Sequence, residues 1–377
     1  MVDFKYGPDL IVFQERARRF IRTHMEPEID YYDQKSLFPR ETFQKFGSEG
    51  FLGAAVPKQY GGQGLGTIGY CLLCEELGRL GAGAIHNGIF QTQKMILEYG
   101  TEALKQRFVP GLCSGSIHAA TAISEPDMGS SFARMKTIAK RDGNFFVLSG
   151  VKTHINDAAE ADLINVFAKT DLGLTVFLVE KGLPGFKIKE KLDPMGLRSS
   201  PIYTLEFDDC RVPDTHVVGE EGQGLSVFVA TFNFSRLGNA STFIGMAREA
   251  LERAINFAKE REVGPARVSD FQGIRWMIAD LYTKLEAAVL LRDKAAHTEE
   301  TEGEVSTLSS MAKYYAGETA VETVMSAIRI VGSHGCYRDT PFERLLRDVK
   351  ALEIAGGTPE IMKNIIATSI LGKPGKA

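Results

Sequence analysis

The 377-residue sequence lacks the features that mark several large classes of protein. It has one tryptophan, five cysteines and little charge imbalance, since 44 lysines and arginines stand against 48 aspartates and glutamates. A net charge of -4 gives no electrostatic reason to expect a nucleic acid or an anionic membrane as partner. No apolar run approaches the ~20 residues that cross a bilayer. The N-terminal stretch MVDFKYGPDL also lacks the basic flank and apolar core of a signal peptide. We therefore expect a cytoplasmic protein.

The few cysteines give little support for a metal or redox site. Cys71 and Cys74 form a CxxC pair, a spacing that can bind metal or exchange disulfides. The pair lies within the helical pattern YCLLCEELGRL, and no second Cys or His pair follows at metal-binding spacing. We interpret both residues as half-buried thiols on a helix and expect no metal.

What the sequence does contain is a division into three parts, too much chain for one hydrophobic core. The first part, residues 1–115, is helical in pattern. Apolar residues at helical spacing between 10 and 21 share one face, and this helix is predicted to end before Pro27. Arg40–Phe46 and Ile68–Leu80 repeat the pattern. We expect an N-terminal helical domain.

The second part, residues 116–222, changes to short runs rich in β-branched and aromatic residues. The runs are FFVLSG, LINVFA, TVFLVE and YTLEFDD, separated by turn signals such as RDGN and KGLPG. This pattern is typical of a small antiparallel barrel or sandwich.

The third part, residues 223–377, returns to long helices that suit a four-helix bundle. The predicted helices are Ala247–Arg261, Phe271–His297, Ser306–Val331 and Pro359–Leu371. The order α, β, α predicts an α+β fold and excludes a doubly wound sheet, in which strands and helices alternate throughout. No GxGxxG motif joins a strand to a helix, which also argues against a Rossmann domain.

Six segments, in order and along nearly the whole chain, resemble those of acyl-CoA dehydrogenases. They are PKQYGGQG (57–64), AISEPDMGSS (122–131), SGVKTHINDAAEAD (149–162), KLDPMGLRSSPIYTLEFDDCRVP (191–213), RIVGSHGC (329–336) and RDVKALEIAGGTPEI (347–361). The resemblance implies that family's fold, with FAD as cofactor and an acyl thioester as substrate.

For the flavin ring, the resemblance implies contacts from Ser124 and the backbone at Ile123. A turn or cap hydroxyl is the alternative for Ser124. His154 stands where the family has a flavin-facing tryptophan, and Asn156 where it has threonine or serine. His154 either tunes the flavin or the acyl pocket, or is a satisfied core histidine.

For the nucleotide half of FAD, the resemblance implies a site shared across a subunit interface, and hence a homodimer or homotetramer. The implied residues are Arg261, Gln272, Arg329, Gly332, Ser333, Thr358 and Glu360. Gly264 replaces an aromatic residue of the family motif, so no ring stacks or packs there. Arg261 could instead interact with a helix dipole, whereas an arginine at 329 suits a phosphate.

The catalytic base is where the sequence departs most from the family. One position of the family's glutamate is Gly356 and the other is Ser235, and neither residue can remove a carbon-bound proton unaided. Gly356 keeps the backbone N–H that would polarise a thioester carbonyl. Glu353 is a candidate base whose alternative is a solvated or bundle-facing carboxylate, and His86 and Asp157 are weaker candidates.

The resemblance also implies contacts with the acyl thioester. Ser130 would lie near the thioester and Arg236 near the nucleotide end of coenzyme A, although a surface ion pair is the alternative for Arg236. Leu352 and Ala355 replace tyrosines that β-oxidation members often carry, which would widen the pocket.

Three explanations for the missing base stay open. The base has moved; or the substrate is an acyl group on an acyl-carrier protein, as in related flavin dehydrogenases of polyketide pathways; or the chain reduces, desulfinates, hydroxylates or only binds flavin. We predict an FAD-dependent oxidoreductase acting on acyl-CoA or acyl-carrier protein, with an electron-transfer flavoprotein as a further partner.

Overall fold

The N-terminal part is helical, as the sequence predicts. The computed structural model describes residues 6–84, 86–303 and 305–373. The helices are α1 (Pro8–Phe20), α2 (Glu26–Lys35), α3 (Arg40–Ser48), α4 (Gly66–Gly78), α5 (Asn87–Tyr99) and α6 (Glu102–Ser114). The predicted break before Pro27 is wrong, since a π-helical turn, Ile21–Met25, joins α1 directly to α2. Pro27 lies in the first turn of α2, directly after the π-helical turn, where the hydrogen-bond pattern of the helix changes.

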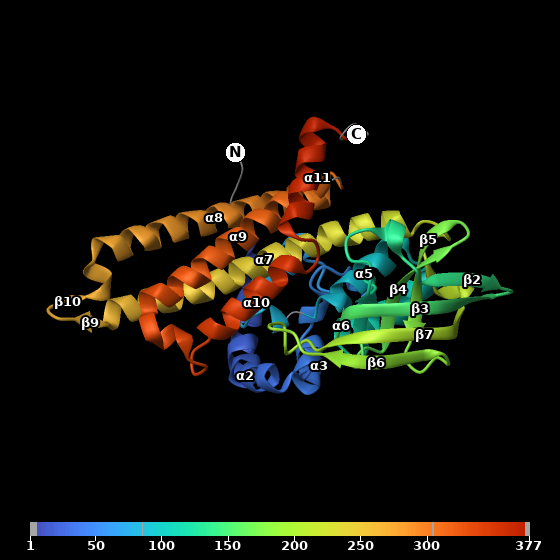
Figure 1. The fold of residues 1–377 in the computed structure, drawn as a ribbon, viewed down its shortest axis with the longest axis horizontal. Coiled ribbons are helices and arrows are strands. Elements are labelled where there is room, and N and C mark those ends of the chain that lie inside the picture. Colours follow the sequence, from blue (N-terminus) through green and yellow to red (C-terminus); the bar gives the residue numbers. More distant parts are fainter. Residues whose placement is uncertain (1–5, 85, 304, 374–377) are drawn as a thin grey trace.

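The middle part is one twisted sheet that contains every predicted strand. Its strands are β1 (Ala119–Ala122), β2 (Ile138–Asp142), β3 (Phe145–Asn156), β4 (Leu163–Thr170), β5 (Gly173–Glu180), β6 (Phe186–Leu192), β7 (Ile202–Pro213) and β8 (Val217–Val218). The order is β6-β7-β3-β2-β4-β5-β8, with β1 beside β4. Most pairs are antiparallel, but β1 and β2 run parallel to β4. The sheet lies at one end of the elongated molecule (Figure 1).

The C-terminal part is a helical bundle that extends away from the sheet (Figure 1). Its helices are α7 (Gly224–Glu260), α8 (Gln272–Thr301), α9 (Ser306–Val331), α10 (Phe342–Ile354) and α11 (Pro359–Leu371). The bounds predicted for α9 and α11 are those observed, whereas α7 starts well before the predicted Ala247. A hairpin of β9 (Glu262–Val263) and β10 (Ala266–Arg267) joins α7 to α8 at the tip far from the sheet.

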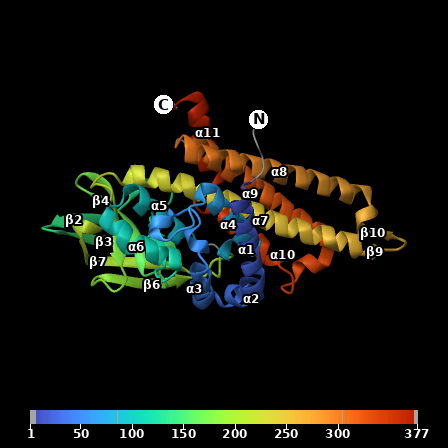
Figure 2. The ribbon, with the colours of Figure 1, turned by 180° about the vertical axis from the view of Figure 1, so that it is seen from behind.

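Helix α5 is the element that links the three parts. It packs against both α7 and β1. Figure 2, which shows the molecule from behind, places α5 and α6 beside the sheet next to the end of α7. A side chain on the inner face of α5 can therefore meet side chains from the bundle.

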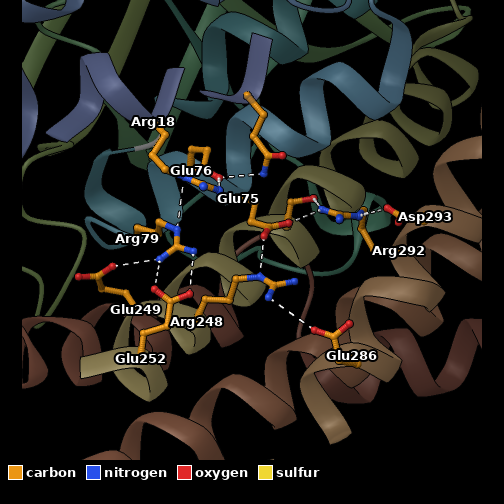
Figure 3. Close-up of polar contacts among 12 residues, drawn as sticks. Arg18, Glu75, Glu76, Arg79, Arg248, Glu249, Glu252, Glu286, Arg292 and Asp293 are labelled. Carbon is orange, nitrogen blue, oxygen red and sulfur yellow. Dashed lines mark hydrogen bonds and ion pairs between the residues drawn. The ribbon is translucent and has the colours of Figure 1, made fainter. Parts of the chain in front are cut away.

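A network of buried charges fixes α4 against α7 and α8 (Figure 3). The Arg292 guanidinium is fully buried and donates to Glu75 Oε2 at 3.2 Å and to Ser241 Oγ at 3.1 Å. Arg248 Nε donates to the other oxygen of Glu75 at 2.7 Å. Burial alone would raise the pKa of Glu75, but the charges of Arg292 and Arg248 hold it below its ordinary value. The N-terminal helices are thus tied to the bundle by paired charges as well as by apolar packing.

The two CxxC cysteines lie on α4, where this helix packs against the bundle. Cys71 and Cys74 are both fully buried on α4, rather than half-buried as predicted. Burial raises the pKa of the Cys71 thiol to about 12 and that of Cys74 well above its ordinary value. Both residues therefore act as small apolar side chains in the core.

Candidate active site

Gly356 lies beside α7, the helix that carries Ser235. Ser235 is buried on α7, and Asn239 follows one turn later on the same face. Gly356 lies in the loop between α10 and α11 with a φ of +66°. A Cβ at position 356 would lie 2.7 Å from Nδ2 of Asn239. The structure therefore fills the space beside Gly356 with an amide instead of a carboxylate.

Ser235 and Asn239 belong to a cluster of polar side chains between α4, α5 and α7, which we call the polar cluster: Tyr70, Asn87, Gln91, Ser235 and Asn239. Nδ2 of Asn87 donates to Oδ1 of Asn239 at 2.9 Å. Nε2 of Gln91 donates to Oγ of Ser235 at 3.0 Å. The Tyr70 hydroxyl donates to Oδ1 of Asn87 at 3.1 Å. Four of the five residues are buried and Asn87 is half-buried.

Apart from Ser235, the polar cluster was missed by sequence reasoning. Its signal is the spacing of two amide or hydroxyl pairs, Asn87 with Gln91 and Ser235 with Asn239, each one helical turn apart. The spacing places each pair on one helix face, but it does not show that the two faces meet.

Buried cations surround the other side of the Gly356 loop. Nζ of Lys313 donates to the carbonyl oxygens of Ala355, at 2.7 Å, and of Gly357. Burial, assisted by the charge of Arg236, lowers the pKa of Lys313 to about 7. Lys313 thus fixes the loop that carries the backbone N–H of Gly356.

Arg236 is buried, so the alternative of a surface ion pair is wrong. Its Nη1 donates to Oδ1 of Asn233 at 2.8 Å and approaches Oγ of Ser310 at 3.5 Å, while its Nε is buried without a partner. Burial lowers its pKa to about 10. No carboxylate pairs with Arg236 among the residues that the structure describes. The site is therefore rich in donors and positive charge.

Glu353, the first candidate for a relocated base, lies in the last turn of α10, just before the Gly356 loop. Its carboxylate pairs with Lys350. Glu353 and Arg329 border an open groove of about 330 Å³ along α9. This placement favours the alternative of a bundle-facing carboxylate.

His86 and Asp157, the weaker candidates, form a buried pair with His118. Nδ1 of His86 lies 2.9 Å from Asp157 Oδ2, and Nε2 of His118 lies 3.5 Å from the same oxygen. The rings of Phe38 and Phe43 cover His86, with centroids at 4.6 and 5.3 Å. Burial alone would raise the pKa of Asp157, but both histidines hold it well below its ordinary value. The aromatic cover favours an interior role over proton transfer from a substrate.

The residues expected at the flavin ring gather at one end of the sheet. The backbone oxygen of Ile123 accepts from Lys152 Nζ at 2.9 Å, and that of Ser124 accepts from Thr153 N at 2.9 Å. The next residue, His154, sits at an irregularity in the β3–β7 pairing with a φ of +59°. His154 is exposed, so the alternative of a satisfied core histidine is wrong.

Asn156 lies beside this group and is fixed by a neighbouring loop. Its Nδ2 donates to the backbone oxygen and to Oγ of Ser200 at 3.2 and 3.1 Å. The same loop bonds α10, since Leu197 N donates to Oδ1 of Asp348 at 2.8 Å. The loop that contains Leu197 and Ser200 thus joins the end of the sheet to α10, the helix before Gly356.

The residues expected at the nucleotide are spread along the bundle, away from the flavin group. Arg261 ends α7 and Gln272 begins α8, both exposed at the tip far from the sheet (Figure 1). Arg329, Gly332 and Ser333 are exposed at the end of α9. Ion pairs to Arg261 and Arg329 are absent from the described part of the chain, so both cations are available to a phosphate. Within a single chain, the residues expected at the flavin ring therefore lie apart from those expected at the nucleotide.

The remaining residues expected at the site are Thr358, Glu360 and Ser130. Thr358 caps α11, and its Oγ1 accepts from Ile361 N at 3.4 Å. Glu360 is exposed in the first turn of the same helix, which begins at Pro359. Ser130 is exposed on the loop between β1 and β2.

Comparison with known proteins covers nearly the whole chain. Family models of the acyl-CoA dehydrogenase N-terminal, middle and C-terminal domains match residues 8–116, 120–210 and 222–371. An acyl-CoA dehydrogenase of Bacillus subtilis (strain 168) is 34% identical over 372 residues, which are 96% of this chain and 98% of that one. The chain belongs to the acyl-CoA dehydrogenase family. The predicted α+β fold with a helical, a β and a helical part is thereby confirmed.

Other relatives in this family differ in reaction and substrate. An acryloyl-CoA reductase (NADH) of Anaerotignum propionicum is 33% identical over 98% of this chain and 96% of its own. Butyryl-CoA dehydrogenase of Megasphaera elsdenii has a TM-score of 0.95 at 30% identity, covering 98% of this chain and all of its own. A prolyl acyl carrier protein oxidase has a TM-score of 0.91 at 29% identity, covering 97% and 99%.

Membership of the acyl-CoA dehydrogenase family settles the general chemistry. Its members are FAD-binding flavoproteins and oxidoreductases that act on CH–CH bonds of acyl thioesters, and one structural neighbour is a complex with FADH2. The expectations of FAD and of an oxidoreductase are confirmed at this level. Among residues 6–84, 86–303 and 305–373, no helix has both the length and the apolarity needed to cross a bilayer.

Proposed function

We propose that this protein is an FAD-dependent oxidoreductase acting on an acyl thioester without a glutamate at either family position. The observation that supports this proposal most is the pairing of Gly356 with Asn239, because it replaces the expected carboxylate with a neutral amide. The FAD, when bound, supplies the two-electron acceptor or donor for the substrate's carbon atoms.

The residues present fit FAD. His154 and Ser124 adjoin one another at the end of the sheet, where they can contact the flavin ring. Arg261 and Arg329 are exposed cations suited to a pyrophosphate. Because these two groups are separated in one chain, a second subunit would complete the site, as a homodimer or homotetramer. Exposed apolar residues on α8, among them Trp276 and Tyr282, give a surface for that contact.

The chain's own residues can polarise the substrate even though they cannot deprotonate it. The N–H of Gly356 is held in place through the two carbonyl groups that Lys313 binds. Directed at a thioester carbonyl, such a donor stabilises the negative charge that develops on the oxygen. Arg236 adds a buried positive charge near this loop.

Three explanations are compatible with a missing base, and relatives illustrate two of them. Reduction of an enoyl thioester would need a hydride from the reduced flavin and a proton from water rather than a base, and one relative is an acryloyl-CoA reductase. Oxidation of an acyl group on a carrier protein is the second, in line with the prolyl acyl carrier protein oxidase. A base contributed from elsewhere is the third. We favour an acyl or hydroxyacyl group bound to coenzyme A or a carrier protein, with an electron-transferring flavoprotein as acceptor.

Anaerobic spectroscopy tests the proposal. The FAD-loaded protein is mixed with saturated and with 2,3-unsaturated acyl thioesters of coenzyme A and of an acyl-carrier protein. Bleaching of the oxidised flavin by a saturated thioester supports oxidation. Reoxidation of a photoreduced flavin by an unsaturated one supports reduction. If the flavin responds to no thioester, the protein binds FAD without this activity; if it purifies fully folded with no capacity for FAD, the cofactor assignment fails.

A further inference from the structure

The polar cluster beside Gly356 contains a donor that the protein itself does not use. Oδ1 of Asn239 accepts from Asn87, so its Nδ2 faces the opposite way, towards Gly356. No hydrogen bond to Nδ2 of Asn239 exists within residues 6–84, 86–303 and 305–373. Asn239 is 3% exposed. Its Nδ2 is not among the fully buried atoms that lack a hydrogen-bond partner, so this donor stays within reach of solvent or of a ligand.

A ligand bound beside Gly356 can supply an acceptor for this donor. The neighbouring oxygens of the loop are already engaged, since Lys313 occupies the carbonyl groups of Ala355 and Gly357. The buried Arg236 adds positive charge near Lys313 and has no carboxylate partner in the part of the chain that is described. An oxygen atom with lone pairs or a negative charge matches this setting, and a purely hydrocarbon group does not.

The polar cluster is tightly packed behind Asn239. Tyr70 donates to Asn87, is fully buried and stacks on Phe234 with ring centroids 4.2 Å apart. A Cβ added at Gly238 would lie 2.0 Å from the Tyr70 hydroxyl, which shows how closely this side chain packs on α7. The hydrogen bond from Asn87 therefore holds the Asn239 amide with its Nδ2 beside Gly356.

We infer that the site beside Gly356 selects an acyl group carrying an oxygen substituent, a hydroxyl or a carboxylate, on its second or third carbon, and that Asn239 recognises this oxygen. The inference rests on the proposed function, since it names the substrate class of the same site. Asn239 would donate from Nδ2 to the substituent and hold its own position through Asn87.

Calorimetric titration of the FAD-loaded protein tests the inference with four pantetheine thioesters of matched length. They are propionyl, 2-hydroxypropionyl, 3-hydroxypropionyl and malonyl. At least one oxygenated member is expected to bind about tenfold or more tightly than propionyl, the size of one well-made hydrogen bond. Equal binding of propionyl and all oxygenated members overturns the inference but leaves the proposed function standing. Binding of none of the four also overturns the inference, and the anaerobic flavin assay then decides the proposed function separately.

Two variants assign the preference to Asn239. Asn239→Leu keeps the volume and removes the donor, so the preference for the oxygenated thioester should disappear while propionyl binding is kept. Asn239→Asp should lose malonyl binding, because the two carboxylates repel each other. This variant keeps the test valid even if the leucine variant does not fold. The control is Asn165→Leu, because Asn165 is equally buried and bonds Thr92 and Thr121 away from the site. A preference that survives in both Asn239 variants refutes the role of Asn239.

Discussion

Replacing Gly356 with alanine should reveal how closely Asn239 fills the space of the missing base. Gly356 has a φ of +66°, and a side chain in this left-handed conformation costs about 1–2 kcal/mol. The new Cβ would also lie 2.7 Å from Nδ2 of Asn239, so that side chain must move. Moving it breaks the 2.9 Å hydrogen bond from Asn87, worth about 1 kcal/mol. Gly356→Ala should therefore lower the free energy of unfolding by about 2–3 kcal/mol.

A double-mutant cycle separates the two contributions. In an Asn239→Ala background, only the backbone strain remains, so Gly356→Ala should cost about 1–2 kcal/mol there. The assay is urea denaturation of the FAD-loaded protein for the parent, both single variants and the double variant. A coupling of about 1 kcal/mol is expected. If the two changes are simply additive, Asn239 does not occupy the space beside position 356 and the reasoning fails.

A glutamate introduced at position 356 tests the same contact through catalysis. Gly356→Glu alone should gain little activity, since its carboxylate has to displace Asn239, whereas Gly356→Glu with Asn239→Ala should exchange the α-protons of a bound thioester with deuterium. Mass spectrometry of the recovered thioester measures this exchange. Equal exchange in both variants would show that Asn239 does not restrict the pocket.

Three further predictions concern the rest of the molecule. Arg292→Met should lower the unfolding free energy by about 2–4 kcal/mol, because the buried Glu75 carboxylate loses one of the two arginines that donate to it and keeps only Arg248; urea denaturation checks this, and a loss below about 1 kcal/mol contradicts it. Burial lowers the pKa of His118, so the unfolded state takes up the proton first and the unfolding free energy should fall as the pH drops below about 6.5. Denaturation at pH 7.5 and 5.5 should show this fall in the parent and a smaller one in His118→Gln; an unchanged slope refutes the assignment. Arg329→Met should raise the Kd for FAD about tenfold, measured by flavin fluorescence, while Arg211→Met, on the sheet, should not.

The distribution of residue types along the chain was enough to predict the elements and their order. The run TVFLVE is buried on both faces, so its short length and its β-branched and aromatic residues predicted a strand, whereas the length and composition of Ser306–Val331 predicted a helix. Where local rules failed, a longer-range reason is visible. Pro27 did not end a helix because a π-helical turn precedes it, and α7 begins at Gly224 because its first turns pack on the sheet.

The sequence by itself also determined which base positions are empty, since Gly356 and Ser235 can be read without coordinates. Only the tertiary structure decided what stands there instead. Asn239 reaches Gly356, and Asn87 reaches Asn239, because α5, α7 and the loop after α10 pack together over more than 100 residues of sequence. Likewise, burial of Arg236 and exposure of His154 depend on neighbours from distant segments. Periodicity indicates which face of a helix is buried, whereas the chemistry of a site depends on which faces meet.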